Sequence, residues 1–163
     1  MAKQFFTHQV FIGLGSNLNQ PEKQVKAAIK TLKNQQYFKL VNQSPLYHSK
    51  PLANLDQPDY CNAVVKLQTD LTAEALLNTT QALEIDLGRQ VKNTRWAARV
   101  IDLDILLFDK LIMTSERLTL PHPGLLHRDF VLKPLYDIEP DLTLPNGMSI
   151  NDALAQLPAK HVY

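Results

Sequence analysis

Two aspartates separated by a single residue, Asp102 and Asp104, are the side chains with the clearest chemical potential. They alternate with Ile101, Leu103 and Ile105, a period typical of a β-strand. Because successive strand side chains point to opposite faces, both carboxylates share one face, with Cα atoms about 6.6 Å apart. Carboxylates this close repel unless cations join them, and such hard oxygen ligands suit Mg²⁺ ions that clamp a polyphosphate. An isolated pair of this kind is more often an exposed strand face or a pair of salt bridges.

The arginines favour the metal interpretation of that pair. All five fall between residues 89 and 128, and the chain before them uses lysine as its long cationic side chain. A planar guanidinium forks onto phosphate or carboxylate oxygens. Guanidinium groups beside metal-binding carboxylates supply the charge neutralisation and positioning that phosphoryl transfer requires. Trp96, the single tryptophan, lies in the polar segment between two of them, where it is suited to cover a flat ring or, equally, to anchor the loop.

The elements that must position these residues follow from periodicity and turn chemistry. The order strand, helix, strand, strand, helix, strand predicts a ferredoxin-like α+β sandwich with an antiparallel sheet, helices over one face, the other face available for a site, and C-terminal additions. Leu107 is predicted to share the apolar face of the last strand with Ile101, Leu103 and Ile105. The strands are expected at 10–14, 40–47, 60–67 and 100–108. One helix is expected to begin at Pro21 and another to lie between Thr72 and Gly88, with short helical pieces near 130–138 and 150–157. Loops are expected at 49–59 and 89–98.

Composition limits the classes of function. The chain has 163 residues, 45% hydrophobic and 20% charged, with a formal net charge of +1, so a single globular domain, 1–163, without bulk attraction to nucleic acid or membrane is expected. The lone Cys61 lies in an apolar run and is predicted to be a small core residue in a reducing compartment. No long apolar run is present, and a cytoplasmic protein with small-molecule partners is expected. Gly13 and Gly15 lack the Walker lysine and a third glycine, and so predict only a tight turn.

Four motifs carry a family resemblance: Gly15-Ser16-Asn17-Leu18, the run 57–63 (QPDYCNA), the run 95–106 (RWAARVIDLDIL) and 120–123 (LPHP). In order and spacing, from about residue 10 to 140, they resemble the 6-hydroxymethyl-7,8-dihydropterin pyrophosphokinases of folate synthesis. The resemblance implies a ferredoxin-like monomer that binds MgATP and then the pterin and releases AMP. This sequence differs from the usual family pattern at Ala97-Ala98, Val91 and Lys50.

The resemblance also implies roles for individual residues. Asp102 and Asp104 would ligate two Mg²⁺ ions, and Arg89 and Arg99 would be catalytic. The remaining positions divide into an ATP group, Gln81, Glu84, Arg95, Trp96, Ile105, Arg117, Thr119, His122 and Arg128, and a pterin group, Ser49, Leu52, Tyr60, Asn62 and Phe130. An aromatic pair with a buried amide would hold a flat heterocycle and read its polar edge.

The mechanism expected from these residues is in-line attack of the pterin hydroxyl on the β-phosphorus of ATP, with segments 49–59 and 89–99 excluding water. Two alternatives stay open. A ferredoxin-like sheet can stack the bases of single-stranded RNA, although the acid pair would repel its phosphates. A kinase for another hydroxymethylated heterocycle would differ only in the shape of its pocket.

Overall fold

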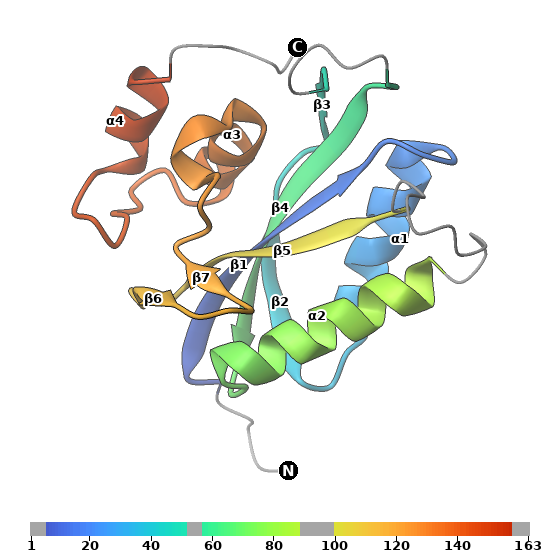
Figure 1. Ribbon diagram of the computed structural model, residues 1–163, viewed down its shortest axis with the longest axis horizontal. Coiled ribbons are helices and arrows are strands. Elements are labelled where there is room, and N and C mark those ends of the chain that lie inside the picture. Colours follow the sequence, from blue (N-terminus) through green and yellow to red (C-terminus); the bar gives the residue numbers. More distant parts are fainter. Residues whose placement is uncertain (1–5, 52–56, 89–99, 158–163) are drawn as a thin grey trace.

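A computed structural model of the chain describes residues 6–51, 57–88 and 100–157. In this part of the chain, five strands form a sheet of order β2-β4-β1-β5, in which β3 also pairs with β4 (Figure 1). All of these pairings are antiparallel. The strands are β1 His8–Ser16, β2 Phe38–Gln43, β3 Tyr47–Ser49, β4 Tyr60–Thr69 and β5 Asp102–Phe108. The predicted ferredoxin-like arrangement is confirmed, with β1 and β4 in the middle of the sheet and β2 and β5 at its edges.

The second predicted strand is divided in two. The expected run 40–47 becomes β2 and β3, with a break around Ser44 and Pro45. Ser44 still bonds β4 there, because its amide donates to the Val64 carbonyl at 2.9 Å and its Oγ accepts from the Val64 amide at 2.9 Å. Proline has no amide proton for a ladder, so the strand resumes only at Tyr47.

Two helices cover one face of the sheet. In α1, Pro21–Lys33, the buried residues Val25, Ala28, Ile29 and Leu32 follow the predicted helical period. Helix α2, Ala73–Leu87, begins where Thr72 Oγ1 accepts from the Ala75 amide at 3.1 Å and ends at Gly88. Together with strand residues they enclose the first core, which includes Cys61, buried as predicted.

The opposite face is covered at one end by the C-terminal additions (Figure 1). These are the short helix η2 Leu125–His127, α3 Asp129–Ile138 and α4 Ile150–Ala155, preceded by the hairpin of β6 Met113–Thr114 and β7 Thr119–Leu120. Helices α3 and α4 enclose a second core that contains Leu132, Leu135 and Ile150. The prediction that this face is available for a site therefore holds only for the part that α3 and α4 leave uncovered.

Strand β5 contains an irregularity that periodicity did not predict. Ile12 of β1 pairs with Ile105, but its neighbour Phe11 pairs with Leu107, so Leu106 is an extra residue on β5. After this bulge the alternation shifts by one residue, and Leu107 packs with Leu106 in the second core. The prediction that Leu107 shares a face with Leu103 and Ile105 was therefore wrong. None of the helices in the three described ranges is long and apolar enough to cross a membrane.

Candidate active site

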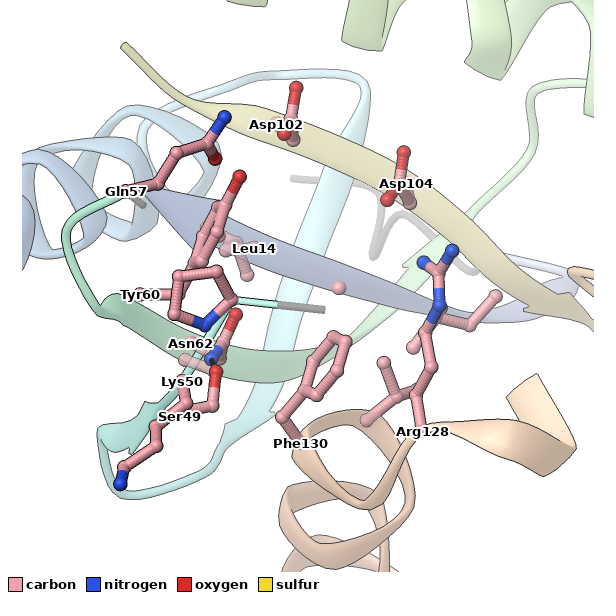
Figure 2. A pocket seen from close by; sticks show the side chains of 16 residues that line it. Leu14, Ser49, Lys50, Gln57, Tyr60, Asn62, Asp102, Asp104, Arg128 and Phe130 are labelled. Atoms are coloured by element: carbon pink, nitrogen blue, oxygen red, sulfur yellow. Dashed lines mark hydrogen bonds between the residues drawn. The ribbon is translucent and has the colours of Figure 1, made fainter. Parts of the chain in front are cut away.

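The two aspartates of β5 line one cavity of about 250 Å³ on the face opposite the first core (Figure 2). Leu103 and Ile105, which alternate with them, are buried against the helices α1 and α2. The strand therefore separates acidic from apolar side chains as its period predicts. Further lining comes from β1, β3, β4 and α3 and from the connecting residues Lys50, Pro51, Gln57 and Arg128. The full set is Gly13, Leu14, Gly15, Ser49, Lys50, Pro51, Gln57, Tyr60, Asn62, Ala63, Asp102, Asp104, Leu106, Arg128, Phe130 and Val131.

A buried amide is fixed in this cavity. Asn62 of β4 and Ser49 of β3 are 5% and 1% exposed, and Asn62 Nδ2 donates to Ser49 Oγ at 2.7 Å. On its other side, Asn62 Oδ1 lies only 3.1 Å from where a Cβ on Gly15 would stand. The amide is thus confined between a hydroxyl and a bare backbone, which holds its orientation toward the cavity.

Two aromatic rings face the cavity from different elements, Tyr60 from the start of β4 and Phe130 from the first turn of α3 (Figure 2). Burial raises the pKa of the Tyr60 phenol, and the negative charge of Asp102 raises it further. Tyr60 is therefore a neutral ring at physiological pH, suited to stack on a flat ligand beside the acid pair.

Arg128 brings a positive charge into the same space. Its Cζ lies 5.8 Å from the centroid of the Phe130 ring, and Figure 2 shows its guanidinium on the same side of the cavity as Asp104. Arg128 and Asp104 act in opposite directions on His122. Burial lowers the pKa of that imidazole, the charge of Asp104 opposes the shift, and the charge of Arg128 adds to it.

His122 itself lies at the open edge of β5. Its amide donates to the Leu106 carbonyl at 3.0 Å, and its Nδ1 accepts from the Gly124 amide at 3.0 Å. Because Nδ1 is the acceptor, the proton of the neutral ring is on Nε2, which leaves that nitrogen as the donor.

Other residues of the predicted ATP group also gather along this edge. Glu84 Oε2 accepts from the Leu103 amide at 3.2 Å, so α2 holds the strand between the two aspartates. Arg117, in the turn between β6 and β7, donates to Gln81 Oε1 at 3.1 Å and to Asn78 Oδ1 at 2.6 Å. Arg117 of the hairpin and Gln81 of α2 are thus joined by a hydrogen bond outside the cavity, whereas Glu84 of α2 bonds β5 directly.

The structure does not bring every predicted residue to the site. Ile105 is 3% exposed and packs in the first core, and Thr119 lies in β7 and does not line the cavity. Sequence reasoning missed the contributions of Gly13, Lys50, Pro51, Gln57 and Val131. Gln57 was detectable as the first residue of the QPDYCNA motif. The predicted Leu52, Arg89, Arg95, Trp96 and Arg99, with the departures Val91, Ala97 and Ala98, lie outside the described residues.

Fold and cavity together define a ferredoxin-like α+β protein with an acid-lined pocket for a small ligand. Residues 11–140 match the family model described as 7,8-dihydro-6-hydroxymethylpterin-pyrophosphokinase (HPPK), and the chain belongs to this family. The family resemblance read from the motifs is confirmed.

Relatives and solved structures agree with this assignment. The chain is 46% identical over 146 residues to the 2-amino-4-hydroxy-6-hydroxymethyldihydropteridine pyrophosphokinase of Haemophilus influenzae, covering 90% of this chain and 91% of the relative. It is 43% identical to the protein of the same name from Pseudomonas aeruginosa, covering 92% of each. A crystal structure of Plasmodium falciparum HPPK-DHPS A437G with SDX-DHP superposes with a TM-score of 0.72 at 15% identity, over 95% of this chain and 46% of that chain, and supports the fold alone.

Proposed function

We propose that this protein transfers a pyrophosphoryl group from ATP to the hydroxymethyl group of 6-hydroxymethyl-7,8-dihydropterin, which yields the pterin diphosphate and AMP in folate biosynthesis. Family membership supports the reaction. The observation that carries it to this chain is the shared cavity, in which Asp102 and Asp104 stand beside a buried amide and two aromatic rings. A polyphosphate site and a site for a flat heterocycle must meet at such a point for the transfer to occur.

The pterin would lie between Tyr60 and Phe130. A pterin is flat and carries donors and acceptors on its edge, so ring stacking holds it and the amide of Asn62 reads the edge. Ser49 keeps that amide in place through the 2.7 Å hydrogen bond. Specificity for the heterocycle therefore depends on Ser49 and Asn62 together.

The donor set fits Mg²⁺. Within the described residues no cluster of three or more His, Cys, Asp or Glu side chains could hold a metal ion, and Asp102 and Asp104 line the cavity as two carboxylates. Mg²⁺ commonly binds through one or two carboxylates and completes its shell with water and substrate phosphates. We propose that the pair holds two Mg²⁺ ions with MgATP; when bound, they neutralise charge on the phosphate oxygens.

The protein's own side chains would then position the reactants. Arg128 would contact phosphate oxygens with its guanidinium, and His122 Nε2 would donate a hydrogen bond to another. Glu84 keeps β5 in place through the Leu103 amide, so the aspartates keep their spacing. The stacked pterin presents its hydroxyl to the β-phosphorus, and the attack is in line with the departing AMP oxygen.

The other features of the proposal concern the whole chain. We propose that residues 1–163 act as one pyrophosphokinase domain, as a monomer, and in the cytoplasm. The sheet shared by two cores supports the single domain, and the buried, unpaired thiol of Cys61 suits a reducing compartment.

The test is nucleotide release with and without the pterin. AMP is expected to form from MgATP only when 6-hydroxymethyl-7,8-dihydropterin is present, with an equal amount of pterin diphosphate by mass spectrometry. Formation of ADP and a pterin monophosphate would contradict the proposal. So would turnover of another hydroxymethylated heterocycle with a higher kcat/KM.

A further inference from the structure

Gly124 occupies a position whose backbone does not require glycine. It precedes η2 with φ −87° and ψ −2°, the right-handed helical region that any residue adopts. Its amide donates to His122 Nδ1, and its carbonyl accepts from the His127 amide at 3.2 Å. Both bonds use backbone atoms of Gly124, so a small side chain at this position would leave them available.

The space beside Gly124 is filled by Arg128. A Cβ on Gly124 would lie 2.6 Å from Arg128 Nε, 2.7 Å from Cζ and 3.1 Å from Cδ. Non-bonded heavy atoms of this kind prefer a separation of about 3.5–4.0 Å. The end of the Arg128 side chain therefore passes over the bare Cα of Gly124, and any side chain there would force the guanidinium to move.

In its present position, the guanidinium of Arg128 belongs to the candidate active site. From it, Arg128 lines the cavity with Asp104 and lies 5.8 Å from the Phe130 ring centroid (Figure 2). The three heavy atoms nearest to a Cβ at position 124 all belong to Arg128. The position of the Arg128 guanidinium in the cavity therefore depends on the absence of a side chain at Gly124.

We infer that Gly124 is a positioning residue whose lack of a side chain admits the Arg128 guanidinium to the cavity, where it meets the phosphates of ATP. The inference rests on the proposed function for the identity of the anion. Substitution at 124 is expected to weaken ATP binding through displacement of Arg128, with little change in the KM for the pterin, since the stacking rings and Asn62 are untouched.

The test is a double-mutant cycle of G124A, R128A and G124A/R128A. We expect R128A to raise the KM for ATP about tenfold or more, as loss of a charge-assisted hydrogen bond does, and G124A to raise it severalfold. The double variant is expected to be no worse than R128A, because the only group that the added methyl displaces is then gone. The inference would be overturned if the rise in the KM for ATP of the double variant equalled the product of the rises in G124A and R128A. A wild-type KM for ATP in either single variant would also overturn it.

Controls separate this effect from loss of folding and from failure of the proposed function. L126A changes an exposed residue of the same turn outside the cavity and is expected to keep the wild-type KM. G124S replaces G124A should the latter not fold. If the wild type makes no AMP, the proposed function fails, and the same cycle is run on the affinity for Mg²⁺-tripolyphosphate by calorimetry. The NMR signal of Arg128 Nε–Hε must shift in G124A, and an unchanged signal would overturn the inference whatever the turnover.

Discussion

In the proposed function, recognition of the heterocycle depends most on Asn62, whose side-chain amide is buried. Ser49 accepts its Nδ2 proton, and both side chains are buried. In S49A the amide loses this partner and is free to turn, at a cost of about 1–3 kcal/mol for a buried polar group left unsatisfied. We expect S49A to raise the KM for the pterin about tenfold and to leave the KM for ATP near its wild-type value, both measured by AMP formation.

Ser44 provides a matched control for that substitution. Its hydroxyl is also buried and also bonds β4, at the Val64 amide, but it does not line the cavity. S44A should lower the melting temperature without a change in either KM. An unchanged pterin KM in S49A, or an equal rise in S44A, would show that Ser49 does not orient Asn62.

For single residues, the sequence predicted which side chains could act in the site better than it predicted the contacts that position them. Alternation along one strand placed Asp102 and Asp104 on a common face, because that inference needs only the period of a strand. It could not show that Glu84 bonds the amide between them, or that Gly124 makes room for Arg128, since neither contact follows from the period of a strand or helix. Motif resemblance indicated Asn62 and Phe130, whereas neither composition nor period distinguishes such residues from core.

At the scale of elements, β3 is held to α3 by a hydrogen bond from the Tyr47 hydroxyl to Asp137 Oδ2. Burial, the hydrogen bond and the charge of Asp137 raise the pKa of Tyr47 to about 12. The folded state therefore holds this proton more tightly than the unfolded chain, whose tyrosine titrates near 10. Its contribution to stability is complete below pH 10 and is lost as the pH rises from 10 through 12.

We expect Y47F to reduce the free energy of unfolding by about 1 kcal/mol at pH 8, the usual net value of a hydrogen bond. The difference between wild type and Y47F should shrink as the pH rises from 10 to 12, when urea unfolding is followed at each pH. Wild-type absorbance at 295 nm should also show a late-ionising phenol that is missing from Y47F. A difference that is constant over this range would contradict the assignment.

The elements themselves were largely predictable, and the exceptions have local causes. Helices α1 and α2 follow apolar periods bounded by Pro21, Thr72 and Gly88, which are local signals. The break between β2 and β3 lies at Pro45, a signal that the sequence does carry. The bulge at Leu106 depends on how β5 pairs with β1, so it leaves little trace in the sequence of β5 itself.

At the scale of the whole molecule, one sheet carries two cores. Strands β1, β4 and β5 contribute side chains both to the core under α1 and α2 and to the core under α3 and α4. The pocket lies on the second face, so the C-terminal helices that supply Phe130 are part of the same sheet-centred unit. The two cores should therefore unfold together.

We expect a single unfolding transition for the wild type, by calorimetry and by circular dichroism. Leu32 of the first core and Leu135 of the second are fully buried, and L32A and L135A should each cost about 2–5 kcal/mol and shift this same transition. Two separate transitions, each shifted by one of the substitutions, would contradict the single domain.

The central claim is that Asp102 and Asp104 together hold the Mg²⁺ of MgATP in the pocket that also takes the pterin. The most direct measurement is the rate of AMP formation as a function of Mg²⁺ concentration in wild type, D104N and D141N, where Asp141 is an exposed acid outside the cavity. D104N is predicted to lose about a hundredfold or more in rate and to require more Mg²⁺, while D141N matches the wild type. Wild-type rate and Mg²⁺ dependence in D104N would contradict the account.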